Sequence, residues 1–165
     1  MLPLILDPSK VKIGLAGAGE AQAKRRAHLA EAGVHPVDIR PDDRDGLSGL
    51  SALYIAGLEH EISAALAGRA RALGIPVNVE DEPLLCDFHV PATVRRGDLL
   101  LTVSSRGRSP GLVRLIREWL SDQFGFEWSE RVAEIGARRA DWRASGLSPA
   151  QISEKTRALA HWWFG

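Results

Sequence analysis

The chain has 165 residues, of which 45% are hydrophobic and 25% charged, and this composition fits one principal domain with an appendage. Lysine plus arginine equals aspartate plus glutamate at 21 each, so the bulk charge gives no reason to expect nucleic acid or a membrane surface as a partner. The chain has a single cysteine, Cys86, and its start lacks a secretory pattern. It also lacks a run of roughly 20 apolar residues, the length that spans a bilayer. Together these features predict a protein of the reducing cytoplasm.

The first half of the chain alternates strand patterns with helix patterns. Residues 11–16 alternate apolar side chains with small or polar ones, as a strand does, and residues 20–32 follow a helical pattern closed by Gly33. Three more short strands are predicted, at residues 35–39, 53–56 and 77–79. A second helix is predicted over 59–73, with one face made by Ile62, Leu66 and Leu73. This alternation predicts a parallel sheet with right-handed crossovers, an open α/β domain over residues 1–85.

The pattern changes after this domain. Residues 99–103 predict a strand, and Ser109-Pro110 predicts a helix start, because serine can accept from free N–H groups and proline suits the first helical position. That helix carries an apolar stripe that needs a partner, made by Leu112, Leu115, Ile116, Trp119 and Leu120. Ser148 and Gln151 form a capping-box pattern before a last helix. All five tryptophans lie within residues 119–163, so we expect a small helical region partly covered by a second subunit.

The turn Gly17-Ala18-Gly19 supplies two of the three small residues of a dinucleotide-binding fingerprint. Gly17 suits the tight turn, and Gly19 lets a pyrophosphate approach the backbone at the start of a helix. The third place holds Gln22, so the match is incomplete, and an ordinary tight turn is an equal alternative.

A residue near the end of the second strand would contact the adenosine ribose of a dinucleotide. The acidic candidates are Asp38, Asp42 and Asp43, and Arg40 stands among them. A carboxylate there favours NAD, whereas an arginine accommodates the 2'-phosphate of NADP, so the residues alone leave the choice open.

An acidic cluster, Glu80-Asp81-Glu82, follows the strand at 77–79, at the end of the sheet where open α/β folds bind ligands. A carboxylate there can act as a general base or, with a neighbour, hold a divalent metal. The alternative is an ordinary solvated loop.

A basic cluster follows, because residues 95–117 contain six arginines and one acid, Asp98, in a chain that is neutral as a whole. The positive charge lies next to the predicted helix start at Pro110, which itself attracts anions. A polycarboxylate or a phosphate would suit this region. Alternatively, the arginines pair with acids from elsewhere in the fold or cover apolar surface.

These signals stand in an order that resembles a known family. The elements that carry the resemblance are Leu-Pro-Leu near the start, Gly17-Ala18-Gly19 with Lys24-Arg25, Asn78-Val79-x-Asp81, Phe88-x-x-Pro91-Ala92 and Ser104-Ser105-x-Gly107-x-Ser109-Pro110. Over most of residues 2–120 the chain is similar to the precorrin-2 dehydrogenase/sirohydrochlorin ferrochelatase family, the dehydrogenase-chelatase module of siroheme synthase. The Asn-Val-x-Asp and Ser-Ser-x-Gly-x-Ser-Pro elements are its most specific parts.

The resemblance implies a homodimer with a Rossmann-like NAD-binding domain over residues 1–85. A dimerisation segment with exchanged strands over residues 86–122 and a helical C-terminal region over residues 123–165 would follow. It implies oxidation of precorrin-2 to sirohydrochlorin with NAD and, in many members, insertion of Fe2+ to give siroheme. Such tetrapyrroles are polycarboxylates, which agrees with the basic cluster. No nucleic acid or membrane is expected as a partner.

The resemblance and the motifs above together assign roles to individual residues. Asp81 is the catalytic residue, the base that takes a proton as hydride leaves, and a transient contact for iron. The cofactor-binding residues are Gly17, Ala18, Gly19, Glu20, Asp38 and Arg40. The substrate-binding residues are Asn78, Ser104, Ser105, Arg106, Gly107, Arg108 and Ser109. The histidines lack the spacing of a fixed metal site.

The chain departs from the family pattern at Gln22, at Ala56-Gly57-Leu58 and at Arg106 and Arg108, and its C-terminal region is short. Two alternative functions therefore remain: a chelatase or tetrapyrrole-binding relative that has lost NAD-dependent activity, and a nucleotide-binding regulatory module without chemistry.

Overall fold

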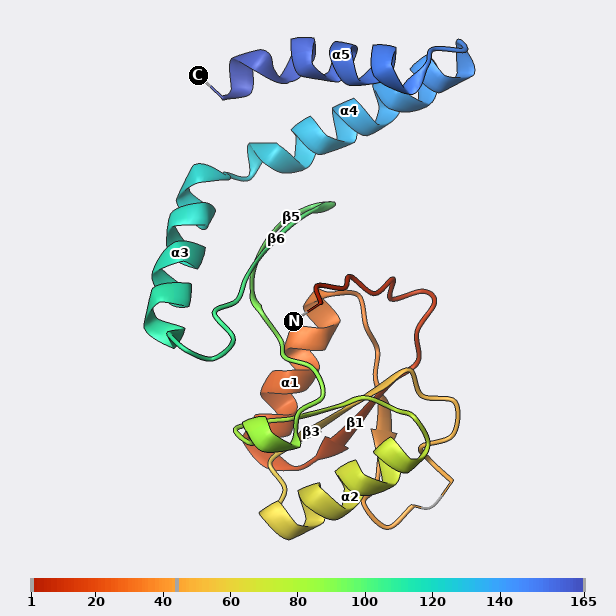
Figure 1. Ribbon diagram of the computed structural model, residues 1–165, viewed down its shortest axis with the longest axis vertical. Coiled ribbons are helices and arrows are strands. Elements are labelled where there is room, and N and C mark those ends of the chain that lie inside the picture. The colour runs from red at the N-terminus through yellow and green to blue at the C-terminus, as the bar shows by residue number, and fades with distance from the viewer. Residues whose placement is uncertain (1, 44, 165) are drawn as a thin grey trace. The chain divides into compact units, whose positions relative to one another are not determined.

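The computed structural model describes residues 2–43 and 45–164, and the chain divides into two compact units, Met1–Val90 and Pro91–Gly165 (Figure 1). The strands of the first unit form one parallel sheet in the order β2-β1-β3-β4. Its elements are β1 (Ile13–Gly17), α1 (Gly19–Glu31), β2 (Val37–Ile39), β3 (Ala52–Ala56), α2 (His60–Ala72), β4 (Val77–Val79) and the 3-10 helix η1 (Pro83–Leu85). The predicted α/β fold class is confirmed.

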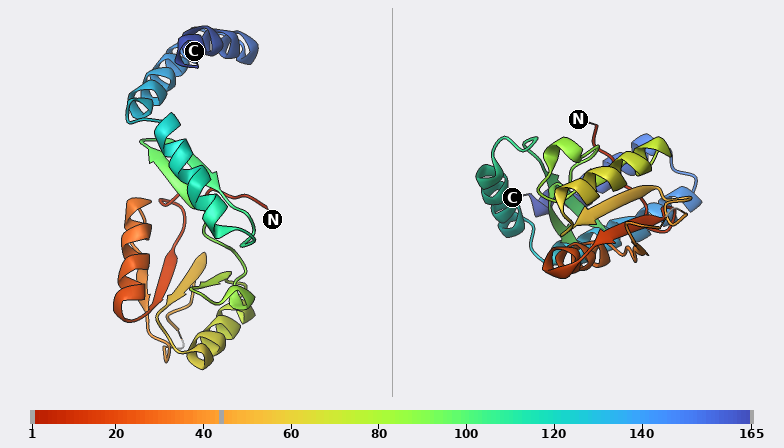
Figure 2. Two further views of the ribbon diagram at one scale, coloured as in Figure 1. Left: turned by 90° about the vertical axis from the view of Figure 1, so that its left-hand side faces the viewer. Right: turned by 90° about the horizontal axis from the view of Figure 1, so that it is seen from below.

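Helices α1 and α2 cover opposite faces of this sheet, as the right-hand view of Figure 2 shows. On one face, Leu66 of α2 packs in the same cluster as Leu53 of β3. On the other face, Leu29 of α1 packs with Ile13 of β1. Because the sheet is covered on both sides, β3 is apolar along its whole length and is buried at four of its five residues.

The buried face of α2 differs from the predicted one. Leu66 is 1% exposed, but Leu73 is 60% exposed and Ile62 is also open to solvent, so two of the three predicted positions are wrong. The residues that α2 buries are Ser63, Leu66, Ala67 and Ala70. Small side chains let a helix lie close to a sheet, and a pattern of large apolar residues does not reveal them.

The second unit begins with an antiparallel hairpin in which β5 (Ala92–Arg96) pairs with β6 (Leu99–Val103). Helix α3 (Pro110–Gln123) lies along this hairpin, as the left-hand view of Figure 2 shows. The chain continues with α4 (Glu127–Ala144), α5 (Pro149–Ala160) and the 3-10 helix η2 (His161–Trp163). The strand predicted at residues 99–103 is confirmed, and β5 and α4 had no separate sequence prediction.

Helices α3 and α5 both start where the sequence predicts, but only α5 has the predicted side-chain cap. The capping box of α5 is present: Ser148 Oγ accepts from the Gln151 backbone N–H at 3.4 Å, and Gln151 Oε1 accepts from the Ser148 N–H at 2.9 Å. Pro110 occupies the first turn of α3 as predicted, but the Ser109 side chain makes no capping bond. The Ser109 N–H donates instead to Ser105 Oγ at 3.0 Å, so the preceding loop fixes this residue by its backbone.

The second unit carries an exposed apolar stripe on α3 and an aromatic cluster around the buried Trp128. The stripe on α3 is open, with Leu115 63% and Trp119 59% exposed. Trp128, at the start of α4, is buried and packs its ring against Phe124, Trp163 and Phe164. Over residues 2–43 and 45–164 no helix has both the length and the apolar character needed to cross a bilayer.

Candidate functional site

The glycine turn stands at the carboxyl end of β1 and leads directly into α1. Gly17 is the last residue of β1, Ala18 is the N-cap, and Gly19 is the first residue of the helix. A Cβ atom on Gly17 would lie 1.8 Å from the Ala56 carbonyl oxygen, so only glycine allows β1 and β3 to end this close together. The need for glycine at this position therefore comes from its close contact with the end of β3.

The space outside this turn is open. Gly19 has φ 67°, and a Cβ atom built on it would meet nothing within 4 Å. No side chain caps the helix at Ala18, so the first N–H groups of α1 remain available to an anion. Glu20 in the first turn is paired with Lys24 at 2.7 Å, which offsets its negative charge. These features suit a pyrophosphate at the start of α1.

The next strand supplies the residues predicted to contact the ribose. Asp38 lies in β2 and forms an ion pair with Arg26 of α1. Arg40 is the first residue after β2, and its Nε lies 4.0 Å from Asp42 Oδ1. Asp43 Oδ1 accepts the backbone N–H groups of Asp45 and Gly46 at 3.0 and 2.9 Å. Each of the three acidic candidates thus has a partner within the first unit.

The acidic loop follows β4, at the same edge of the sheet as the glycine turn, because all four strands are parallel. Its outer two acids have partners from the flanking helices. Glu80 lies 3.5 Å from Arg25 of α1, and Nδ1 of His60 at the start of α2 lies 2.8 Å from Glu82. Asp81 between them is exposed, and within the described residues its carboxylate makes no hydrogen bond or ion pair. The loop therefore presents one free carboxylate out of three.

The backbone at Asp81 is unusual, with φ 58° in the left-handed region. Few residues other than glycine tolerate this conformation, and aspartate and asparagine are among them. The turn that imposes it is closed on both sides. The Glu80 N–H donates to the Ile55 carbonyl at 2.9 Å, and the Glu82 N–H approaches the Val79 carbonyl at 3.4 Å.

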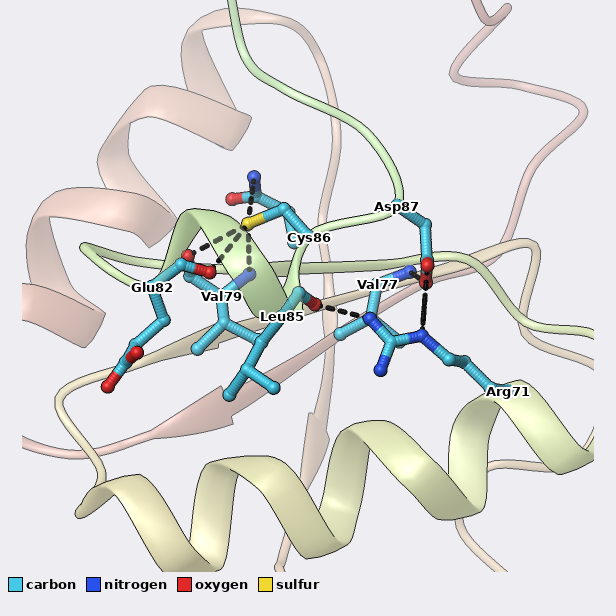
Figure 3. A network of polar contacts seen from close by, with 8 residues as sticks. Arg71, Val77, Val79, Glu82, Leu85, Cys86 and Asp87 are labelled. Carbon is cyan, nitrogen blue, oxygen red and sulfur yellow. Dashed lines mark hydrogen bonds and ion pairs between the residues drawn. The ribbon is translucent and has the colours of Figure 1, made fainter. Parts of the chain in front are cut away.

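Cys86 holds this turn from inside, as Figure 3 shows. Its Sγ lies 3.3 Å from the Val79 backbone nitrogen, 3.1 Å from the Val79 carbonyl oxygen and 3.4 Å from the Glu82 carbonyl oxygen. Asp87 next to it accepts from the Val77 N–H at 2.9 Å and pairs with Arg71 of α2. The segment after the acidic loop is thus tied to both β4 and α2.

Asn78 was predicted to contact substrate, and the structure turns its side chain inward. The residue is buried in β4, and its Nδ2 donates to the Phe88 carbonyl at 2.9 Å and approaches Cys86 Sγ at 3.6 Å. This geometry suits a residue that positions the segment after Asp81, and contact of Asn78 with substrate stays a prediction.

The remaining predicted substrate residues form the loop between β6 and α3 in the second unit. Arg106 and Gly107 have φ values of 58° and 75°, which turn the chain sharply before the helix. Ser104 Oγ approaches the Arg106 N–H at 3.4 Å, and Ser105 Oγ accepts from the Ser109 N–H at 3.0 Å. The two serine hydroxyls therefore hold the loop in shape.

The arginines of the basic cluster divide into two groups. Arg96 donates to the Phe124 and Ser121 carbonyls, and Arg114 and Arg117 pair with Glu118. The hydrogen bond from Arg114 lowers the pKa of Glu118 below its ordinary value. Arg106 and Arg108 are exposed, and among the residues described here no acid lies within ion-pair distance of them. Together with exposed Arg95 of β5, which also has no ion-pair partner among the described residues, these two guanidinium groups are the cations of the cluster available to an anionic ligand.

Two features of the site had little or no sequence signal. The role of His60 is visible only in three dimensions, because the residue lies 22 positions before Glu82. Arg25 also stacks over the ring of Tyr54 at 5.4 Å while it faces Glu80. In the described part of the chain no three His, Cys, Asp or Glu residues gather as a metal site would require.

In a comparison with known protein families, residues 4–92 match the family model described as putative NAD(P)-binding. The chain is 32% identical to a siroheme synthase of Ectopseudomonas mendocina over 171 residues, which cover 90% of this chain and 36% of that protein. It is 41% identical to a siroheme synthase of Pseudomonas paraeruginosa over 146 residues, covering 79% of this chain and 31% of that protein. The chain thus spans about a third of the length of these relatives.

A solved structure of "SirC, precorrin-2 dehydrogenase" has a TM-score of 0.75 to this chain at 17% identity, covering 96% of this chain and 89% of that one. At this identity the likeness establishes the fold. The resemblance predicted from the ordered motifs is confirmed by the relatives and by this structural neighbour.

Proposed function

Because this chain belongs to the putative NAD(P)-binding family, we propose that it is a dehydrogenase that oxidises precorrin-2 to sirohydrochlorin with an oxidised nicotinamide dinucleotide. NAD is the acceptor that the sequence resemblance implies, and the chemistry at the nicotinamide ring is the same for NAD and NADP. The observation that carries the proposal is the free carboxylate of Asp81 at the edge of the sheet where the glycine turn opens.

The residues at the start of α1 fit a dinucleotide. Gly17, Ala18 and Gly19 leave the helix N-terminus open, and Glu20 is neutralised by Lys24. These N–H groups would bind the pyrophosphate. When bound, the oxidised nicotinamide would supply a hydride acceptor.

Asp81 is proposed as the general base. As precorrin-2 loses a hydride to the dinucleotide and a proton to the enzyme, the Asp81 carboxylate would accept that proton. Its neighbours Glu80 and Glu82 are drawn toward Arg25 and His60, so they neither compete for the proton nor crowd the substrate. Asp81 sits in a left-handed turn after β4, and its side chain is exposed.

The substrate is proposed to meet the loop of Ser104, Ser105, Arg106, Gly107, Arg108 and Ser109. Exposed Arg106 and Arg108 would pair with peripheral carboxylates of the macrocycle, and charge-assisted bonds of this type are the stronger ones. Truncation of both arginines to alanine should raise KM for precorrin-2. Truncation of Arg138, which pairs with Glu134 on α4, should leave KM unchanged.

A homodimer is proposed as the working form, because the open stripe on α3 would be covered by a second copy. The proposal includes the three predicted regions: the NAD-binding domain at residues 1–85, the dimerisation segment at 86–122 and the helical region at 123–165. It also includes the reducing cytoplasm as the location of the protein. Insertion of Fe2+, as a substrate, stays a prediction.

The test is an anaerobic absorbance assay with precorrin-2 and either dinucleotide. Asp81→Asn keeps a residue that tolerates the left-handed backbone, and we expect turnover to fall by about 100-fold or more with the dimer intact. The matched control is Glu61→Gln, an exposed acid on α2, which should turn over like the unmodified chain. Unchanged turnover of Asp81→Asn would remove Asp81 from the mechanism.

A further inference from the structure

Gly57, the first residue after β3, contacts the start of α1, where the dinucleotide site is proposed. We propose that Gly57 is a positioning residue for the pyrophosphate. It allows the first turn of α1 to pack close to the sheet, which is the task of the third small residue in the fingerprint. This inference rests on the dinucleotide site proposed above. It explains two departures from the family pattern, at Gln22 and at Gly57, as one exchange.

Helix α1 lacks a small residue at the third fingerprint position. In the fingerprint that residue lets the helix pack closely on the strand. Here the position holds Gln22, whose longer side chain is half-buried. The residue that α1 buries fully is Leu29, near the end of the helix. The first turn of α1 therefore needs another contact to fix its place on the sheet.

The main chain at Gly57 supplies this contact. A Cβ atom on Gly57 would lie 2.3 Å from the Ala18 carbonyl oxygen and 3.2 Å from the Cβ of Ala21. Ala18 is the N-cap of α1, and Ala21 lies in its first turn. The nearest obstacle is main chain, which cannot rotate out of the way as a long side chain can. Any side chain at position 57 would therefore push the start of the helix away from β3.

The ends of β1 and β3 contact each other reciprocally. Gly17, at the end of β1, faces the Ala56 carbonyl oxygen, and Gly57 faces the carbonyl oxygen of Ala18 in return. The Ala18 N–H also donates to the Ala56 carbonyl at 3.2 Å. Ala56 and Gly57 thus fix Ala18 at both its N–H and its carbonyl.

The position of Ala18 matters because it begins the helix. The carbonyl of an N-cap residue accepts the first hydrogen bond within the helix. The N–H groups of the first turn have no partner inside the helix, and they are the groups that would bind the pyrophosphate. A shift of the Ala18 carbonyl changes the direction of these N–H groups. Gly57 therefore acts on dinucleotide affinity through Ala18.

Gly74 separates this contact from the need for a left-handed backbone. Gly57 and Gly74 both have φ 74°, a conformation that favours glycine. A Cβ atom on Gly74, however, would meet nothing within 4 Å. Gly57→Ala and Gly74→Ala therefore share the same backbone strain, whereas Gly57→Ala also presses on α1.

The experiment is a calorimetric titration of the full chain with NAD and with NADP, with circular dichroism to show that each variant is folded. Gly57→Ala should weaken binding by about tenfold or more. Gly57→Asn eases the strain of the left-handed backbone but still carries a Cβ atom, so it should also weaken binding about tenfold or more. Gly74→Ala should stay within about twofold of the unmodified chain.

Steady-state kinetics add a readout that general destabilisation would not produce. With Gly57→Ala, KM for the dinucleotide should rise, while KM for precorrin-2 stays within about twofold.

Gln22→Ala tests the exchange independently of how the Gly57 variants fold. If Gly57 sets the packing of α1, Gln22→Ala should bind the dinucleotide within about twofold of the unmodified chain. A larger gain in affinity would show that Gln22 limits the turn, and a larger loss would show that Gln22 itself supports it. Either result would overturn the proposal.

The outcomes separate this inference from the proposed function. If the unmodified chain binds neither dinucleotide, the proposed dehydrogenase fails together with the role of Gly57. If it binds one, and Gly57→Ala or Gly57→Asn binds as tightly, the role of Gly57 is refuted and the dehydrogenase proposal stands. An equal loss in Gly74→Ala would show an effect of backbone strain alone and would also refute it.

Discussion

Gly17 and Ala56 end neighbouring strands so close together that a Cβ atom on Gly17 would stand 1.8 Å from the Ala56 carbonyl oxygen. The same carbonyl accepts the Ala18 N–H at 3.2 Å. One contact therefore sets both the spacing of β1 from β3 and the direction in which the chain enters α1. Any change at Gly17 should be felt in stability and in ligand binding together.

We expect Gly17→Ala to lower the free energy of unfolding by at least about 2 kcal/mol, because φ 151° and the contact with Ala56 both exclude a side chain. Dinucleotide binding should be lost with it. The control is Gly68→Ala on α2, where nothing lies within 4 Å of the new atom. That change should stabilise the chain by about 0.5–1 kcal/mol. Urea unfolding followed by circular dichroism measures both, and a Gly17→Ala chain as stable as the original would contradict the packing argument.

Asp87 ties the segment after the acidic loop to β4 and α2. Asp87→Ala leaves the Val77 N–H and the Nε–H of Arg71 without their acceptor, while Arg71 keeps its bond to the Leu85 carbonyl, and we expect a loss of about 1–3 kcal/mol. Asp87→Asn retains an acceptor oxygen and should lose less. Thermal unfolding of the two variants beside Glu61→Ala, an exposed acid, gives the comparison; equal stability of all three would show that the network in Figure 3 is not needed.

Tyr54 is the chain's only tyrosine, so the absorbance of tyrosinate follows this residue alone. Burial raises the pKa of Tyr54 above its ordinary value, while the charge of Arg25 lowers it. A spectrophotometric titration should find the folded chain ionising above pH 10, the value of the unfolded side chain. Arg25→Ala should move the pKa of Tyr54 further upward.

The same shift fixes the sign of the pH dependence of stability. The unfolded tyrosine ionises first, so the contribution of Tyr54 to stability is complete below about pH 10. It is lost as the pH rises through the higher pKa of the folded state. Tyr54→Phe should therefore unfold with less dependence on pH above 10, and an unchanged slope would speak against the shift.

The contribution of the aromatic cluster to stability can be measured by comparing alanine variants of Trp128 and Trp162. Trp128 is 8% exposed and packs on three aromatic rings, whereas Trp162 is 83% exposed. We expect Trp128→Ala to cost about 3–5 kcal/mol and Trp162→Ala less than about 0.5 kcal/mol. Urea unfolding of the two variants distinguishes these values, and equal losses would show that the cluster does not stabilise α4.

Local signals in the sequence predicted the parts of the fold that depend on neighbouring residues. The glycine turn, the capping box of Ser148 and the strand at residues 77–79 each follow from side chains within a few positions. The buried face of α2 did not, because Ala67 and Ala70 carry little hydrophobic signal although they lie against the sheet. Ser109 also failed as a cap, since its backbone is held by Ser105.

In the candidate site, too, features set by neighbouring residues could be predicted, and features set by distant residues could not. The acidic loop was a candidate because of its place after a strand, and the resemblance pointed to Asp81 within it, but the reason why Asp81 has no partner among the described residues could not be predicted. That reason lies in Arg25 and His60, which come from two different helices and bind Glu80 and Glu82. The inward turn of Asn78 depends on Phe88, which is ten residues away. Such partners meet only when the sheet and both helices have formed.

The left-handed backbone at Asp81 offers a practical opportunity. Glycine occupies φ 58° without steric cost, so Asp81→Gly would delete the proposed base while relaxing the main chain. On the proposed mechanism this variant would be a substrate trap. Crystals grown with both reactants would retain the unreacted macrocycle beside its oxidant and give a direct image of the encounter.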